Sequence, residues 1–152
     1  MNGSNSSPSR FSVEIFRMNH ASAELAARIV DECREWMKGR EEIEFAFLYG
    51  SFVSLGTFHD VDLGLFLNEQ SLQADFDIAS DLSGRLTSRF RLPFDVRVLN
   101  DAPVSFLYHV FRGRLVYCVD PERLADRVEY VLPRYFDRCG FLRHYTREAF
   151  AA

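Results

Sequence analysis

The stretch FLYGSFVSLGTFHDVDLGLFL, residues 47–67, decides the fold of this chain. It begins as an apolar strand, turns at Gly50 and Ser51, and becomes a strand again around Asp60 and Asp62. Successive side chains of a strand point to opposite faces, so two aspartates separated by one residue share a face. Such a pair can hold a hard divalent cation, and the turn can offer N–H groups and a hydroxyl to a phosphate. The stretch therefore predicts metal-assisted phosphoryl or nucleotidyl transfer.

A later strand pattern adds a third acid. In DVDLGLFL, residues 60–67, every second residue is apolar and points to one face, and the aspartates lie on the other. PFDVRVLN, residues 93–100, repeats this alternation with Asp95 and Arg97 on its polar side. If the two strands are neighbours, Asp95 lies on the same face as the aspartate pair.

Alternating helical and strand patterns cover most of the chain. We expect helices over 21–38, 71–90, 103–113 and 121–150, and strands over 44–50, 60–67, 93–100 and 114–119. The apolar stripe of the second helix consists of Leu72, Phe76, Ala79, Leu82 and Leu86. That of the last helix, where Pro133 predicts a break or a kink, consists of Val128, Val131, Leu132, Tyr135, Phe136, Phe141 and Tyr145. These patterns predict an α/β sheet with helices on one face and the acids on the open face.

The composition is typical of one soluble globular domain. The chain has 152 residues, 47% of them hydrophobic, and a formal net charge of −4, with no broad basic surface for nucleic acid. We expect a disordered tail over residues 1–10 and a single domain over residues 11–152. No apolar run is long enough to span a bilayer. Cys33, Cys118 and Cys139 lack CxxC spacing, which favours buried free thiols and a cytoplasmic location.

Three carboxylates are a sufficient protein contribution to a nucleotidyl-transfer site with two cations. In this interpretation Asp60 and Asp62 bridge the cations, and Asp95 completes the one that activates the acceptor hydroxyl, or serves as the base. Two other interpretations stay open. An aspartate pair alone is common turn chemistry, and Asp95 could instead pair with Arg97 or with an arginine of the preceding helix.

The turn would complete the phosphate site. Gly50 would let the backbone approach the phosphates, and Ser51 would donate its hydroxyl. Phe52 and Val53 would contribute their N–H groups.

The motifs LYGSF, DVDLGLFL and FDVRVLNDAP, followed by a helix ending in HVFRGRLVY, resemble the minimal nucleotidyltransferases of the DNA polymerase β superfamily, particularly the MntA-like antitoxins. The resemblance covers most of the chain. It implies a polymerase β-like palm of the α/β (α+β) class with a mixed sheet, Gly50 and Ser51 at the nucleotide, and Asp60, Asp62 and Asp95 as metal ligands. It also implies Mg²⁺, ATP as substrate, and transfer of AMP to a tyrosine of a HEPN-domain toxin, which silences that toxin.

The loop between the turn and the aspartates departs from the family pattern. It has eight residues, FVSLGTFH, two fewer than in many relatives, with Gly56 one position late and His59 directly before the first aspartate. This change puts the nucleotide preference in doubt more than the fold. We interpret His59 as a surface or supporting residue, and the turn Arg112, Gly113, Arg114 as solvated.

The leading hypothesis is a minimal nucleotidyltransferase that transfers AMP to a protein tyrosine, as the antitoxin of a HEPN partner. One alternative is a catalytically silent antitoxin that neutralises its toxin by binding alone. Another is a nucleotidyltransferase that acts on a small molecule. We expect no membrane association and no direct binding of nucleic acid, and the sequence leaves the oligomeric state and the acceptor open.

Overall fold

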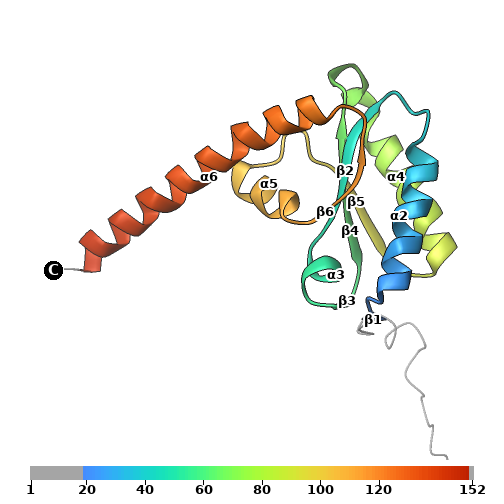
Figure 1. The fold of residues 1–152 in the computed structure, drawn as a ribbon, viewed down its shortest axis with the longest axis horizontal. Coiled ribbons are helices and arrows are strands. Elements are labelled where there is room, and N and C mark those ends of the chain that lie inside the picture. The colour runs from blue at the N-terminus through green and yellow to red at the C-terminus, as the bar shows by residue number, and fades with distance from the viewer. Residues whose placement is uncertain (1–18, 151–152) are drawn as a thin grey trace, which may run out of the picture.

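A central four-stranded sheet organises the computed structural model, which describes residues 19–150 (Figure 1). Its strand order is β5-β4-β2-β6, with β4 and β5 parallel and the other two pairs antiparallel. The strands are β2 (Ile43–Tyr49), β4 (Val61–Leu67), β5 (Phe94–Val98) and β6 (Arg114–Cys118). The helices are α2 (Ala23–Met37), α3 (Ser51–Ser54), α4 (Asp75–Phe90), α5 (Val104–Phe111) and α6 (Pro121–Phe150), with a 3₁₀ helix η1 (Glu69–Ala74). The predicted α/β class and mixed sheet are confirmed, and the expected tail over residues 1–10 lies outside the described residues.

Helices α2 and α4 cover one face of the sheet (Figure 1). Helix α2 begins where the Ser22 hydroxyl accepts a hydrogen bond from the N–H of Leu25, which satisfies one of the free donors of the first turn. Both helices bury a stripe at helical spacing against the apolar side of β4, as the alternation of that strand predicts. The stripe residues are Ile29, Val30, Cys33, Trp36 and Met37 of α2, and Ile78, Leu82 and Leu86 of α4.

The second face is open over only part of its area. Helices α5 and α6 pack on it, over an aromatic cluster in which the rings of Phe45 and Phe66 stack with centroids 4.5 Å apart. Phe66 shares a strand face with Asp62 but is 1% exposed. The alternation of β4 was therefore predicted correctly. The open area, however, is limited to the end of the sheet where the carboxylates lie.

Helix α4 begins later than the sequence predicts. Residues Glu69–Ala74 form the 3₁₀ helix η1. Phe76 lies within α4 two residues before the buried Ile78, so it points to nearly the opposite side of the helix. It is 78% exposed, and its assignment to the core is wrong. Ile78 takes the expected place in the core.

Helix α6 runs through Pro133 without the predicted break. Proline removes one backbone hydrogen bond, which would have reached the carbonyl of Glu129, and both residues are exposed, so water can satisfy that oxygen. Val131 is buried as expected, whereas Phe136 is 57% exposed, so the expected core stripe is wrong at that position. The side chains of Phe141 and Tyr145 lie outside the described residues.

The loop that departs from the family pattern is ordered by its own contacts. It contains α3 and β3 (Thr57–Phe58), and β3 pairs with β1 (Asn19–His20). The buried rings of Phe52 and Phe58 meet edge to face at 4.8 Å. Cys33 is buried, Cys118 and Cys139 are partly buried, and all three are free thiols. None of the helices within residues 19–150 is long and apolar enough to cross a membrane.

Candidate active site

Three carboxylates meet at the start of the two parallel strands. In the register of β4 and β5, Asp62 lies directly beside Asp95, and Asp60 precedes β4 by one residue. One oxygen from each of the three carboxylates lies within 4.8 Å of the others. Carboxylate oxygens are the ligands that Mg²⁺ and other hard divalent cations prefer. The sequence prediction that these three residues share one site agrees with this geometry, and their role as ligands stays a prediction.

The cluster concentrates negative charge in a half-buried place. Burial raises the pKa of the Asp62 carboxyl from its ordinary 3.8 to about 6, and the charges of Asp60 and Asp95 add to this effect. The Arg97 guanidinium acts in the opposite direction. Tyr49, which pairs with Asp62 across β2 and β4, has its pKa raised to about 12 by burial and by the Asp62 charge, so it stays neutral. A divalent cation would relieve the repulsion among the three carboxylates.

Asp62→Asn is expected to stabilise the metal-free protein at pH 8 and to have little effect at about pH 3. A folded-state pKa above the unfolded value means that Asp62 contributes stability below pH 3.8, and that this contribution is lost as the pH rises through 6. After allowance for solvent screening, the gain at pH 8 is about 1 kcal/mol, or roughly 2–4 °C in Tm. Thermal unfolding in excess chelator measures it. Asp101→Asn, at an exposed carboxylate outside the cluster, is the control, and an equal gain at both pH values would contradict the assignment.

Asp95 also forms the ion pair that the sequence left open. The Nε and Nη2 atoms of Arg97 donate to one Asp95 oxygen at 2.9 and 2.6 Å. The Arg97 side chain is 59% exposed, so this pair is a surface contact that adds little to the free energy of folding. The pairing and the carboxylate cluster coexist because Asp95 has a second oxygen. Sequence analysis treated the two as alternatives, and the structure shows both.

Gly50 occupies a conformation that only glycine adopts readily. Its φ of 75° and ψ of −159° end β2 and begin α3. A Cβ atom at this position would overlap the Asp62 carboxylate, so the turn and the carboxylate cluster are in direct contact. Ser51 is the first residue of α3 and is partly exposed. The N–H of Val53 donates to the Gly50 carbonyl at 3.2 Å, so the expectation that this N–H serves a phosphate is wrong.

A cleft of about 300 Å³ adjoins the turn on the side away from β5. Its walls are the turn and the C-terminal end of α5, and its lining residues are Gly50, Val53, Ser54, His109, Arg112 and Gly113. Arg112 was interpreted only as part of a solvated turn, but in the fold it lines this cleft together with His109 and the Gly-Ser turn. Its guanidinium lies 5.7 Å from the centroid of the Tyr108 ring. His59, by contrast, is exposed and lines none of the described pockets, as a surface role predicts.

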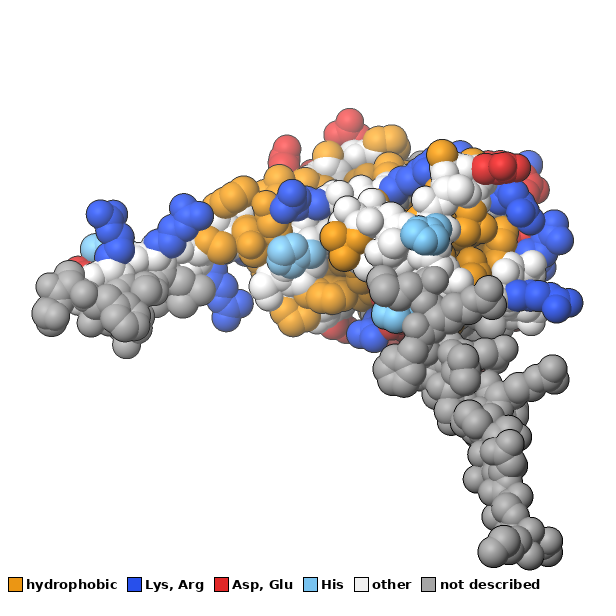
Figure 2. All heavy atoms as spheres, turned by 90° about the horizontal axis from the view of Figure 1, so that it is seen from below, with side chains coloured by type: hydrophobic (Ala, Val, Ile, Leu, Met, Phe, Trp, Pro, Cys, Tyr) orange, Lys and Arg blue, Asp and Glu red, His pale blue; other side chains and the backbone are white. Residues whose placement is uncertain are grey.

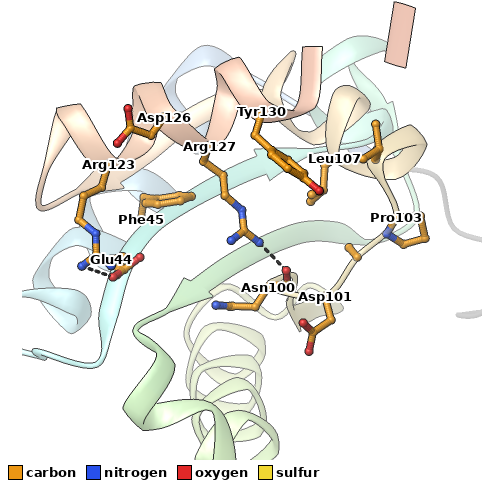
Figure 3. Close-up of a pocket in the computed structure, with 12 residues that line it drawn as sticks. Glu44, Phe45, Asn100, Asp101, Pro103, Leu107, Arg123, Asp126, Arg127 and Tyr130 are labelled. Carbon is orange, nitrogen blue, oxygen red and sulfur yellow. Dashed lines mark hydrogen bonds and ion pairs between the residues drawn. The ribbon is translucent and has the colours of Figure 1, made fainter. Parts of the chain in front are cut away.

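A larger cavity, of about 670 Å³, lies at the opposite end of the sheet (Figure 3). Its two arginines bind acceptors of the protein itself. Arg127 donates to the carbonyl oxygen of Asn100, and Arg123 pairs with Glu44 (Figure 3). These contacts hold the start of α6 against the start of β2 and against the loop that follows β5. The cavity is remote from the carboxylate cluster, and we assign the chemistry to the cluster and not to the larger volume.

Comparisons with known proteins agree with this geometry. Residues 31–122 match the sequence model of the polymerase beta nucleotidyltransferase family, and this range includes the turn, the three aspartates and Arg112. The fold is similar to that of a solved MntA–HepT toxin–antitoxin structure, with a TM-score of 0.52, 14% identity, and coverage of 82% of this chain and 95% of that one. No curated protein sequence matches the chain significantly.

Two further structures share the fold. One is the complex of a tri-AMPylated HEPN toxin of Shewanella oneidensis with its MNT antitoxin, at a TM-score of 0.54, 13% identity, and coverage of 83% of this chain and 98% of that one. The other is a toxin–antitoxin structure with AMP-PNP, at a TM-score of 0.52, 14% identity, and coverage of 80% and 94%. At these identities the likeness shows a common fold.

Proposed function

The chain belongs to the polymerase β nucleotidyltransferase family, and from this premise we propose that it transfers AMP from ATP to a tyrosine of a HEPN-type protein as the antitoxin of a toxin–antitoxin pair. The observation that carries the proposal is the cluster of Asp60, Asp62 and Asp95, with oxygens within 4.8 Å of one another and in contact with the Gly-Ser turn. The structures that share the fold come from such toxin–antitoxin pairs, and one contains an AMPylated toxin.

The donor set suits Mg²⁺. All three groups are carboxylates, and burial, with a smaller contribution from the charges of Asp60 and Asp95, raises the pKa of Asp62, so a bound cation would favour its ionised form. Asp60, Asp62 and Asp95 would therefore hold the cation. When bound, it would supply charge stabilisation to the attacking and leaving oxygens of a nucleotidyl transfer.

The order of elements separates an ATP side from an acceptor side. Gly50 and Arg112 lie on the β2 and α5 side of Asp62, so the triphosphate would occupy the cleft between them. Asp95 lies on the edge strand β5, away from this cleft. There it would orient the phenol and accept its proton. The tyrosine oxygen would attack the α-phosphorus of ATP, and the bond from that phosphorus to the pyrophosphate oxygen would break.

A catalytically silent antitoxin would not need this cluster. Three carboxylates held close together lower the free energy of unfolding at neutral pH, as the shifted pKa of Asp62 indicates. An antitoxin that only bound its toxin would gain nothing from this loss of stability. The cluster thus favours catalysis over neutralisation by binding alone. A cytoplasmic location is part of the proposal, supported by the three free thiols, and cell fractionation would test it.

The purified chain, incubated with ATP, Mg²⁺ and the HEPN-type protein encoded beside it, is expected to add one or more AMP masses to that protein. Intact-mass spectrometry measures the addition. The Asp60→Ala, Asp62→Ala double variant should add none, because it removes both ligands shared by the cations. Excess chelator should likewise prevent the addition. Neutralisation of the partner by the double variant, with no change in mass, would replace catalysis by the binding hypothesis.

The AMP-transfer assay also tests whether the triphosphate binds in the cleft. Arg112→Ala should raise the ATP concentration needed for half-maximal transfer by about tenfold, as expected for the loss of one charged contact to a phosphate. Arg114→Ala is the matched control, because that arginine is also exposed but does not line the cleft. Equal behaviour of the two variants would remove the triphosphate from this cleft without affecting the role of the carboxylates.

A further inference from the structure

The second half of α6 projects from the body, while its first half is fixed (Figure 1). Arg123 and Arg127 hold the first turns to the sheet, as described above. Among the described side chains, the last aromatic contacts with the body are those of Tyr135, whose ring stacks on Tyr108 with centroids 3.7 Å apart, and of Phe136, whose ring meets Tyr108 edge to face at 5.7 Å. The helix continues to Phe150, which is about four further turns. A projecting helix whose base is fixed presents its side chains in a defined direction.

One face of this projecting segment is exposed and combines apolar, small and cationic residues. Phe136, Gly140, Arg143 and Arg147 recur at i, i+4, i+7 and i+11, the spacing of a single helix face. All four are exposed, and Phe136 is exposed over 57% of its surface. Figure 2 shows hydrophobic and cationic side chains, with little acid, where this helix leaves the body.

Gly140 is unusual within such a face. Glycine is among the least favourable residues inside a helix, and a Cβ atom at Gly140 would meet nothing within 4 Å in this chain. Nothing within the described fold therefore requires the absence of a side chain there. Its absence would be useful where the backbone of another helix comes close to α6.

The charge of this segment distinguishes among the molecules that could bind the face. Residues 134–150 contain four arginines and two acids, a formal charge of +2, whereas the whole chain carries −4, which leaves −6 on the rest. A second copy would bring like charges together if it packed through the same face. The acidic body would also repel a nucleic acid that extended beyond the helix. An acidic helix that contacts only the projecting segment is the occupant that the local charge of +2 favours.

We propose that the face formed by Phe136, Gly140, Arg143 and Arg147 is the docking surface for an acidic helix of a partner protein. The proposal rests on the function proposed above only in identifying this partner with the protein that receives AMP. The arginines would pair with carboxylates, Phe136 would pack between side chains of the partner, and Gly140 would mark the point of closest approach.

Gly140→Ala is the first test, because it is expected to stabilise the free protein and weaken the complex. Alanine should raise the Tm of the isolated chain by about 2–4 °C. It should also weaken binding of the HEPN-type protein encoded beside this chain by at least tenfold, measured by calorimetry without ATP. Gly84→Ala in α4 is the matched control, because Gly84 is also an exposed helix residue with open space at its Cβ position. That variant should gain the same stability and keep full affinity. Equal affinities of the two variants would overturn the proposal, as would the absence of any complex with the wild-type chain.

The second test reverses charge. The Arg143→Glu, Arg147→Glu variant should lose at least tenfold in affinity, with a weaker dependence on salt, while its ATP binding stays unchanged. Lys38→Glu, Arg91→Glu reverses two exposed charges elsewhere and should bind normally. Self-association of the wild-type chain in sedimentation that Arg143→Glu, Arg147→Glu abolishes would assign the face to a second copy. Binding of a labelled single-stranded RNA that the same variant abolishes would assign it to nucleic acid. Either result overturns the proposal. Complex formation without AMP transfer would overturn the proposed function and leave the docking surface in place.

Discussion

Asp95→Asn is expected to lower the rate of AMP transfer by about 100- to 1000-fold while leaving ATP binding nearly unchanged. Asp95 lies on the edge strand β5, and the Gly-Ser turn and the cleft lie on the other side of Asp62. In the proposed mechanism an asparagine would keep the shape of the side chain but lose the charge that would orient the acceptor and take its proton. An interaction made only in the transition state affects turnover and not ground-state binding.

Asp62→Asn is the matched comparison. Asp62 adjoins both the turn and Asp95, so its loss should weaken ATP binding and transfer together. Calorimetry with ATP and Mg²⁺ gives the affinities, and single-turnover transfer gives the rates. A measured gain in the Tm of Asp62→Asn at pH 8 would show that the variant is folded. Full transfer by Asp95→Asn would remove this residue from the site, and equal losses of ATP affinity in both variants would contradict the separation of roles.

Gly50→Ala is expected to lower AMP transfer at least 100-fold, through two separate physical effects. The backbone at Gly50 has φ 75° and ψ −159°, a conformation that costs an alanine about 1–3 kcal/mol. The new Cβ would also overlap the Asp62 carboxylate, so the strand end or the carboxylate has to move. Displacement of Asp62 would take one ligand away from the cluster, and the relocated turn would no longer border the cleft.

Gly56→Ala is the control that distinguishes backbone strain from overlap of the new Cβ with a neighbouring side chain. Gly56 also has a positive φ, of 71°, but a Cβ there would meet nothing within 4 Å. This variant should lose about 1 kcal/mol of stability and keep its transfer rate. Thermal unfolding and the mass-based transfer assay measure both variants. Comparable transfer by Gly50→Ala and Gly56→Ala would show that contact between the turn and Asp62 is not needed for the reaction.

Local sequence was sufficient to place Asp62 and Asp95 within their strands and Asp60 directly before the first of them. The period of two in DVDLGLFL and PFDVRVLN fixes which side chains share a face, and this holds whatever the strands pack against. The positive φ of Gly50 is likewise a local property, because glycine adopts this conformation without steric cost. The element boundaries agree with the structure to within a few residues wherever the apolar period is long.

The residues that the sequence assigned wrongly to the core are ones whose burial depends on their position around a helix and on contacts with distant segments. Phe76 points outward because it lies two residues before the buried Ile78 in the same helix. Phe136 touches the Tyr108 ring of α5 at its edge but keeps 57% of its surface exposed. The Asp95–Arg97 pair and the carboxylate cluster were not alternatives, since one carboxyl group has two oxygens.

The sequence by itself determined the chemistry available to this protein: two acids on one face of a strand, a third acid on a later strand, and a glycine turn before the pair. Only the tertiary structure decided that β4 and β5 are parallel neighbours in register, which brings Asp62 and Asp95 together. It likewise decided that Arg112 lines a cleft together with the turn. The physical reason is that backbone alternation is a local property of each strand. Strand pairing and helix docking, by contrast, are set by burial of apolar surface between segments far apart in the chain.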